Sequence, residues 1–207
     1  MKTNYQTEME KEISRLPQNT RPMLLLQCCC APCSSAVLET LVKNFDVTVY
    51  FYNPNIHPQA EYEKRLLQFP KLLSAEIYQT VKTLDTPYNP ETFFDAVKGL
   101  ENEPEGGARC TECFKLRLSQ TAKTAKEMGF DYFTTTLTVS PHKNAALLNE
   151  IGLQLEKQYG VRFLMSDFKK KEGYKRSIEL SKAFDLYRQT DCGCIFSKRD
   201  VSGENAD

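Results

Sequence analysis

The hydrophobic positions of the chain form short continuous runs that alternate with longer segments of helical periodicity. Leu24-Leu25-Leu26 is an apolar run typical of a buried strand, and Val47–Tyr52 is β-branched and aromatic, also typical of a strand. The predicted strands, in chain order, cover residues 24–26, 47–52, 75–81, 132–139 and 161–165. The predicted helices cover residues 34–45, 61–73, 93–97, 109–128, 140–160 and 172–187.

This alternation of strands and helices predicts an α/β fold, in which a parallel sheet carries helices on both faces. The 207 residues suit one domain with a full hydrophobic core. We expect residues 1–20 to form a loose or helical N-terminal extension, residues 21–199 the main domain, and residues 200–207 a flexible tail. The acidic, glycine-rich residues 101–107 are expected to form a mobile loop.

Local sequence signals set the expected ends of the helices. Ser34 or Ser35 is expected to cap the first helix of the main domain, and Ser140-Pro141 to begin a later one. Pro70 must end or kink the helix that contains it. Gly129 is a natural stop for the helix before it.

The charge balance is neutral, with 27 Lys and Arg against 27 Asp and Glu, so net charge indicates no polyanionic partner. A local basic face stays open as an alternative. No apolar run is long enough to cross a membrane, and the first twenty residues are unlike a secretory signal. The chain is therefore expected to be cytoplasmic, where disulfides are unfavoured. Its eight cysteines then indicate metal binding or thiol redox chemistry.

The cysteines lie in three groups that are far apart in sequence. Four of them fall within residues 28–33, directly after the first predicted strand and before a helix. This position is the carboxyl end of a sheet, where open α/β folds bind ligands, and it is also a helix N-terminus, which favours thiolates. Cys110 and Cys113 lie on one side of a helical turn, and Cys192 and Cys194 flank a single glycine. We expect the fold to bring the three groups together.

Two interpretations of the cysteines differ in the metal. A structural zinc needs four ligands, and pairing Cys110 and Cys113 with Cys30 and Cys33 would leave four cysteines unused. That surplus favours an iron–sulfur cluster plus a second function, against a stabilising zinc with spare buried cysteines. The Cys-Gly-Cys segment is either a strained, redox-active pair or two further metal thiolates.

The other candidate residues have weaker signals. Asp167 follows the last predicted strand and is a metal ligand, an acid or, as spacing favours, a helix N-cap. His57 and His142 are expected to make surface or helix-start hydrogen bonds rather than to bind metal. Basic residues concentrate near the C-terminus and form either a solvated face or a phosphate-binding rim: Lys169, Lys170, Lys171, Lys175, Arg176, Arg188, Lys198 and Arg199.

Between Leu24 and Ser197 the chain resembles the QueH family of epoxyqueuosine reductases. The resemblance is carried by five motifs, at residues 29–33 (CCAPC), 109–118 (RCTECFKLRL), 134–144 (TTTLTVSPHKN), 166–170 (SDFKK) and 186–194 (LYRQTDCGC). Residues 1–20 and the last ten residues lie outside it.

The resemblance implies an oxidoreductase that acts in the last step of queuosine formation in tRNA. The epoxide of epoxyqueuosine, at the wobble position of the anticodon, is reduced to an alkene, and the oxygen leaves as water. This implies a tRNA partner and an external electron donor. It also implies a Rossmann-type fold like those of HUP and PP-loop nucleotide-binding proteins, in which a cysteine-rich turn replaces the phosphate loop. The cofactors implied are a [4Fe-4S] cluster and a second metal ion, taken as iron, without cobalamin.

The family pattern also implies roles for individual residues of the catalytic domain, residues 21–199. The cluster ligands are expected to be Cys29, Cys30, Cys110 and Cys113. Cys192 and Cys194 are expected to be a redox-active pair, with Cys33 and Asp167 as candidates for a second metal or for proton delivery. The main alternative is a zinc-stabilised nucleic-acid-binding module without catalysis. An ATP-using tRNA thiolase ranks last, because residues 28–33 offer no glycine-rich phosphate cradle.

Overall fold

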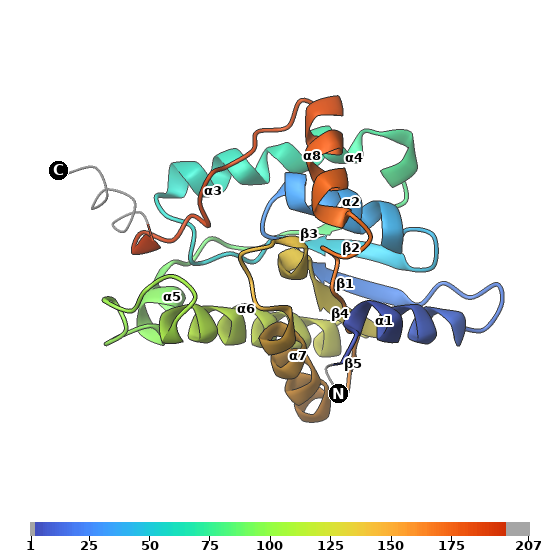
Figure 1. Cartoon of the computed structure of the whole chain (residues 1–207), viewed down its shortest axis with the longest axis horizontal. Coiled ribbons are helices and arrows are strands. Elements are labelled where there is room, and N and C mark those ends of the chain that lie inside the picture. Colours follow the sequence, from blue (N-terminus) through green and yellow to red (C-terminus); the bar gives the residue numbers. More distant parts are fainter. Residues whose placement is uncertain (1–2, 198–207) are drawn as a thin grey trace.

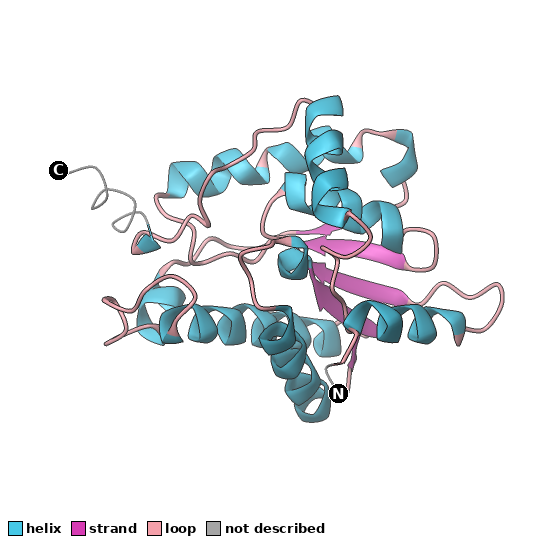
Figure 2. Cartoon of the chain, viewed as in Figure 1, coloured by secondary structure: helices cyan, strands magenta, loops and turns pink. Residues whose placement is uncertain are grey.

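The computed structural model of the chain describes residues 3–197 and has one five-stranded, all-parallel sheet (Figures 1 and 2). The strand order is β3-β2-β1-β4-β5. The strands are β1 (Met23–Gln27), β2 (Asp46–Tyr50), β3 (Lys82–Leu84), β4 (Tyr132–Thr135) and β5 (Arg162–Phe163). This confirms the predicted α/β class with a parallel sheet, and the architecture is Rossmann-like.

Helices cover both faces of the sheet (Figure 1). The α-helices are α1 (Tyr5–Ser14), α2 (Ala31–Leu41), α3 (Gln59–Leu66), α4 (Gln68–Leu73), α5 (Glu91–Ala96), α6 (Ala108–Glu127), α7 (Ala145–Tyr159) and α8 (Gly173–Ala183). Two 3₁₀ helices, η1 (Glu76–Tyr78) and η2 (Thr136–Val139), complete the described elements. α2 packs against α8, and α6 packs against α7.

The strands divide the core into two apolar layers because successive side chains of a strand point to opposite faces. Leu24 and Leu26 of β1 belong to the layer that includes residues of α2, whereas Leu25 belongs to the layer of α6 and α7. All three leucines are fully buried. A strand buried on both faces must be apolar at every position, which explains the uninterrupted leucine run.

The N-terminal segment contains helix α1, whose N-cap Asn4 accepts a hydrogen bond from the backbone of Thr7. Met9 of this helix is buried in the core layer of Leu24. Glu12 accepts a 2.7 Å hydrogen bond from the Tyr132 hydroxyl. The predicted tail, residues 200–207, lies outside the described residues. Within residues 3–197, no helix combines the length and hydropathy that a membrane crossing requires.

The expected caps at Ser34 or Ser35 are wrong, because the helix begins earlier. α2 starts at Ala31, and its N-cap is Cys30, whose Sγ accepts a 3.4 Å hydrogen bond from the Cys33 backbone N–H. Pro32 lies in the first turn, where its missing N–H has no cost. The cysteine motif is therefore itself the helix start.

Three other boundaries also differ from prediction. β4 ends at Thr135, because the Thr135 hydroxyl accepts from the Leu137 N–H and turns the chain into η2. α7 begins at Ala145 rather than at residue 140, with Asn144 as its N-cap. The strand predicted over 75–81 is the 3₁₀ helix η1, followed by β3. Each difference arises from a side-chain cap or a 3₁₀ turn that hydrophobic periodicity does not detect.

The predicted effects of Pro70 and Gly129 on the ends of helices are confirmed. The helix predicted over 61–73 breaks at Leu67, between α3 and α4, three residues before Pro70, which cannot donate to the backbone of Leu66. Gly129 has φ +74° and follows the end of α6. These are local rules that hold without tertiary context.

The strand order places a topological switch point at β1. The chain runs from β1 through β2 to β3 on one side, and then returns to β4 on the other side of β1. Connections diverge at such a point and leave a crevice beyond the carboxyl ends of the two central strands. Residues 28–33 follow β1 at this crevice.

Gly152 of α7 allows a test of the packing in the core layer of α6 and α7. A Cβ on Gly152 would lie 2.4 Å from the ring of Phe163, which is 4% exposed. Gly152→Ala should therefore lower the free energy of unfolding by about 1–3 kcal/mol through overpacking, measured by urea denaturation. Gln154→Ala, an exposed change on the same helix, should alter it by less than about 0.5 kcal/mol. Equal stability of the Gly152→Ala and wild-type proteins would contradict this packing.

Candidate functional site

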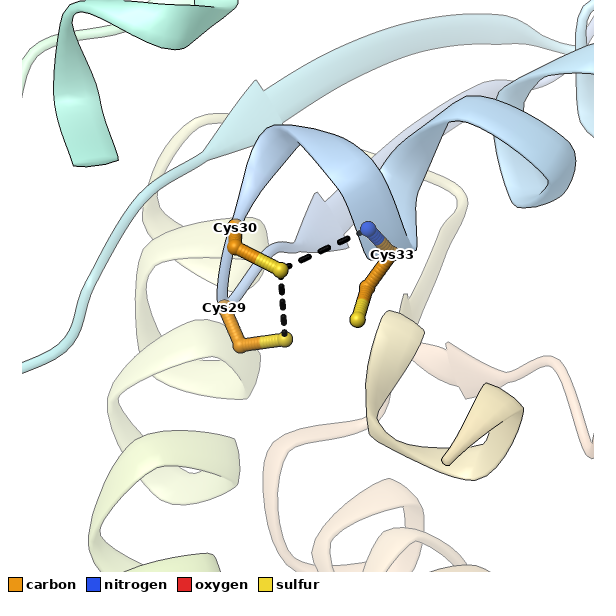
Figure 3. Close-up of side chains that lie close together, drawn as sticks. All are labelled: Cys29, Cys30 and Cys33. Atoms are coloured by element: carbon orange, nitrogen blue, oxygen red, sulfur yellow. Dashed lines mark hydrogen bonds between the residues drawn. The ribbon is translucent and has the colours of Figure 1, made fainter. Parts of the chain in front are cut away.

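Three cysteines gather where the turn after β1 leads into the first turn of α2 (Figure 3). The Sγ atoms of Cys29, Cys30 and Cys33 all lie within 4.8 Å of one another, and those of Cys29 and Cys30 are 3.8 Å apart. The Cys29 N–H donates to the Thr136 hydroxyl, which joins this turn to the end of β4. The three sulfurs therefore lie at the switch point of the sheet.

The local electrostatics make this turn a site for a thiolate. The N-terminus of α2 carries partial positive charge and favours anions. The thiols of Cys30 and Cys33 hydrogen bond to Cys29, and with the positive charges of Lys143 and Arg117 they hold the pKa of Cys29 well below its usual value. Burial raises the pKa of Cys30 to about 12. The thiolate form is thus favoured at Cys29, whereas its two neighbours favour the protonated thiol.

Cys28 does not belong to this group. Its side chain is fully buried in the core layer of Leu24, and burial raises its pKa far above the usual value. The resemblance assigned it no role, and its place in the structure is that of a small apolar core residue.

Cys110 and Cys113 lie in the first two turns of α6 and face the Cys192–Cys194 turn. All four line a cavity of about 210 Å³. Burial raises the pKa of both helical cysteines, that of Cys113 to about 11, although the nearby guanidinium of Arg117 opposes the shift at Cys113. The i,i+3 spacing therefore aims both sulfurs into one cavity, as the sequence predicted.

The Cys192–Cys194 turn is fixed by contacts with the loop after β2 and with α3. Gly193 has φ +87°, and its carbonyl accepts a 2.9 Å hydrogen bond from the His57 N–H. Arg65, which is 2% exposed, forms ion pairs with Glu61 at 2.7 Å and with Asp191 at 3.5 Å. A Cβ on Gly193 would lie 3.1 Å from the Arg65 guanidinium, and this tight contact and the positive φ together favour glycine.

Cys192 and Cys194 are both free thiols of unequal acidity. A hydrogen bond from Cys194, assisted by the Ser197 hydroxyl, lowers the pKa of Cys192 to about 6. The same interaction raises the pKa of Cys194, so that thiol keeps its proton. A thiolate beside a protonated thiol is the arrangement typical of redox-active cysteine pairs.

A second cavity, of about 520 Å³, is lined by Cys29, Cys33 and Cys192 among others. Six residues line both cavities: Glu105, Gly106, Arg117, His142, Lys143 and Cys192. The three cysteine segments therefore form the walls of two adjoining cavities. Within residues 3–197, the one group of three or more potential metal-binding side chains with closely spaced ligand atoms is Cys29, Cys30 and Cys33.

Asp167 lies apart from the cysteines. It follows β5, pairs with Lys169 at 3.1 Å and lines neither cavity. Its predicted role as a helix N-cap is wrong, because α8 begins at Gly173 and its N-cap is Glu172. Residues 167–170 form a turn before that helix.

Most of the basic C-terminal residues that the structure describes belong to a solvated face. Lys171 pairs with Glu10, and Arg176 pairs with Glu39 at 2.8 Å. Arg188 is the exception: it lines the second cavity, and its guanidinium lies 5.3 Å from the centre of the Tyr174 ring. Lys198 and Arg199 lie outside the described residues.

Sequence reasoning missed two buried polar residues of the site. Asn55 is 3% exposed, lines the first cavity, and has a side-chain oxygen without a partner among residues 3–197. Arg117 is equally buried and lines both cavities. The available signal was the spacing of α6, which puts residue 117 one helical turn after Cys113 on the inward face, where an apolar residue is normally found.

Comparisons with known proteins agree on one family. A family model described as "Epoxyqueuosine reductase QueH" matches residues 24–200. A relative from Streptococcus pyogenes serotype M1, named epoxyqueuosine reductase QueH, is 44% identical over 96% of this chain and 79% of its own. Relatives of the same name from Staphylococcus epidermidis and Thermotoga maritima are 45% and 37% identical, over 95% and 84% of this chain and 85% and 89% of their own.

The acidity of Cys192 gives a prediction for the metal-free, reduced protein. Because its pKa is lowered to about 6, its thiolate is present above that pH and is lost as the pH falls through it. The rate of Cys192 alkylation, measured by peptide mass spectrometry, should therefore rise with a midpoint near that value. Cys194→Ala removes the first cause of the shift and should move the midpoint upward by more than about one pH unit. Ser197→Ala should move it less, and an unchanged midpoint in Cys194→Ala would contradict the coupling.

Proposed function

The chain belongs to the QueH family of epoxyqueuosine reductases, and from that premise we propose that it reduces epoxyqueuosine to queuosine at the wobble position of a tRNA anticodon. Both carbon–oxygen bonds of the epoxide break, a carbon–carbon double bond forms, and the oxygen leaves as water. The reaction consumes two electrons and two protons, which an external donor and the solvent ultimately replace. Reduced thiols and a tRNA substrate both suit the cytoplasm, where we propose that the reaction takes place.

The observation that carries this proposal is the wall of the second cavity. Cys29 and Cys33 line it from the β1 turn, and Cys192 lines it from the C-terminal turn. Its volume of about 520 Å³ lies within the range of small-molecule sites. We propose that the modified base enters this cavity, so that the epoxide lies between the two cysteine groups.

The donor set suits an iron–sulfur cluster. Thiolates are the usual ligands of such clusters, and Cys29 already favours the thiolate form. As the family pattern implies, the residues proposed to hold the cluster are Cys29, Cys30, Cys110 and Cys113. When bound, a [4Fe-4S] cluster with a second iron would supply single electrons and a Lewis acid for the epoxide oxygen, without cobalamin.

Cys33 is better supported than Asp167 as a second-metal ligand or proton donor. Cys33 lines the second cavity and lies within 4.8 Å of the sulfurs of Cys29 and Cys30. Asp167 lines neither cavity and is paired with Lys169. A role for Asp167 would require Lys169 to release it.

The Cys192–Cys194 pair is proposed as the second redox centre. Joining the Cys192 thiolate and the Cys194 thiol in a disulfide releases two electrons and one proton, and the second proton must come from another acid. The external donor then restores the two thiols. The two cysteines flank Gly193, which has a positive φ that glycine adopts without strain. We propose that this backbone conformation lets the two sulfurs approach each other closely enough to form the disulfide.

Basic and aromatic side chains around the second cavity support a nucleic-acid substrate. Lys143 and Arg188 line it and provide cations for phosphate oxygens. Tyr174, which also lines it, offers a ring on which a base stacks. A local basic rim of this kind needs no positive net charge.

The redox role of the pair predicts the effect of Cys192→Ser. Turnover should be abolished, while the visible absorption of the cluster stays intact, because Cys192 is not among the proposed ligands. Turnover is measured under anaerobic conditions on tRNA that carries epoxyqueuosine, by the loss of one oxygen from the released nucleoside. The matched control is Cys28→Ala, a change in the core, which should keep both iron and activity. Full activity of Cys192→Ser would eliminate the proposed role of the pair.

Metal content separates the reductase from the zinc-stabilised, non-catalytic alternative. Protein purified without oxygen should be brown and contain iron and acid-labile sulfide. Cys29→Ala should lose most of both, because it removes a proposed ligand. A colourless preparation that contains zinc and no iron would favour the nucleic-acid-binding module and would contradict the reductase proposal.

A further inference from the structure

Arg117 is a buried cation between the two cavities. It lies on α6 one helical turn after Cys113, is 3% exposed and lines both cavities. Its Nη2 donates a 2.6 Å hydrogen bond to Asn53 Oδ1, whereas its Nε has no partner among the described residues. This acceptor is a neutral amide, so the charge of the guanidinium is not balanced by the hydrogen bond.

The charge of Arg117 therefore needs a counter-charge. An arginine stays protonated even when buried, and an unbalanced buried charge costs several kcal/mol. No carboxylate in residues 3–197 lies within ion-pair distance of Arg117. Glu105 also lines both cavities, but its side chain is exposed and makes no ion pair with Arg117. Asp191 also lines the second cavity, but its carboxylate pairs with Arg65 at 3.5 Å. The cysteines are therefore the acidic groups along these walls that remain to balance Arg117.

Two other buried arginines show how this protein normally treats such a charge. Arg65 is paired with the carboxylates of Glu61 and Asp191. Arg109 donates to backbone carbonyls of the 101–103 segment and lies over the ring of Phe196. Arg109 keeps its Nε and Nη2 without a hydrogen-bond partner among residues 3–197. Arg65 lines only the second cavity and Arg109 only the first, whereas Arg117 lines both.

The position of the guanidinium is fixed by a chain of amides. Asn53 Nδ2 donates a 2.8 Å hydrogen bond to the carbonyl of Cys28. Gln27 Nε2 lies 3.4 Å from Asn53 Oδ1, and Gln27 Oε1 accepts a 2.8 Å bond from the Thr135 hydroxyl. The charge is therefore tied to the ends of β1 and β4, beside the Cys29 turn.

We propose that Arg117 is a positioning residue that supplies the fixed positive charge for the metal-binding thiolates on either side of it. It touches neither substrate nor reacting atoms, and it acts by stabilising anionic sulfur in the β1 turn and on α6. It lines the first cavity together with Cys113 and the second together with Cys29. The identity of the metal centre in this inference rests on the proposed function. The position of the Arg117 charge comes from the structure alone.

The test uses full-length Arg117→Met, Arg117→Lys and the control Lys115→Met. Lys115 is on the same helix, carries the same charge and is half exposed, so its removal changes net charge without changing the site. The first measurement is a titration of the reduced, metal-free protein with Co²⁺, followed by sulfur-to-cobalt absorption. Arg117→Met should bind Co²⁺ at least tenfold more weakly, Arg117→Lys should recover to within about threefold, and Lys115→Met should match the wild type.

Thermal unfolding of the same metal-free proteins distinguishes this role from a structural one. A charge kept for an anionic site destabilises the empty fold, so Arg117→Met should be at least as stable as the wild type. Asn53 Oδ1 keeps Gln27 as a donor in that variant. A lower melting temperature with unchanged Co²⁺ affinity would instead make Arg117 a structural residue and would overturn the proposal.

A third measurement uses the iron-loaded protein without tRNA. Loss of the nearby positive charge should make the centre harder to reduce, so the reduced fraction at a fixed poised potential should fall in Arg117→Met and recover in Arg117→Lys. None of these readouts needs turnover. If the wild type fails to form queuosine but Arg117→Met loses Co²⁺ affinity, the proposed function fails and this inference stands. If turnover is present and Co²⁺ affinity is unchanged, the reverse holds. A wild type that binds no Co²⁺ through thiolates would overturn the inference as well.

Discussion

The pairing of β1 with β2 on one side and β4 on the other is the constraint on which the site depends. It makes β1 the centre of the sheet, buries its leucines on both faces and directs the chain after Gln27 into the crevice beyond two strand ends. The Cys29 N–H then bonds to Thr136, at the end of the neighbouring strand. Thiols arrive at this edge from α6, which packs on β1 and β4, and from the segment after α8, which packs on α2 over the other face of the sheet.

The two thiol groups at this edge follow one electrostatic pattern. In the β1 turn, Cys29 is the thiolate and Cys30 keeps its proton. In the C-terminal turn, Cys192 is the thiolate and Cys194 keeps its proton. In each case burial alone would disfavour the anion, and a hydrogen bond from a neighbouring thiol overcomes it. The first group also has helix α2 and buried or nearby cations behind it, which suits a metal centre, whereas the second suits electron transfer by thiols.

Periodicity predicted the fold class, the parallel sheet and the approximate place of most elements, since these depend on which residues are apolar. It failed where one side chain decides a boundary: Cys30 caps α2, Thr135 ends β4, and Asp167 caps no helix. Cysteine spacing predicted that Cys110 and Cys113 point to the same side of α6, but not that Cys33 joins Cys29 and Cys30 most closely. The spacing of α6 placed Arg117 on the inward face, but its role was not predicted, because the function of a buried charge is recognised only when its neighbours in space are known.

The contacts that fix residues 191–194 have a practical consequence for the production of this protein. Residues 191–194 are fastened by Arg65 and by the loop that carries His57, and Ser197 hydrogen bonds to Cys192 at 3.5 Å. A histidine tag inserted directly after Ser197 would lie beside the reactive sulfur of Cys192, and its histidines would compete for the same metals. An affinity handle is better attached before α1, and any cleavage enzyme should be chosen to spare the segment after α8.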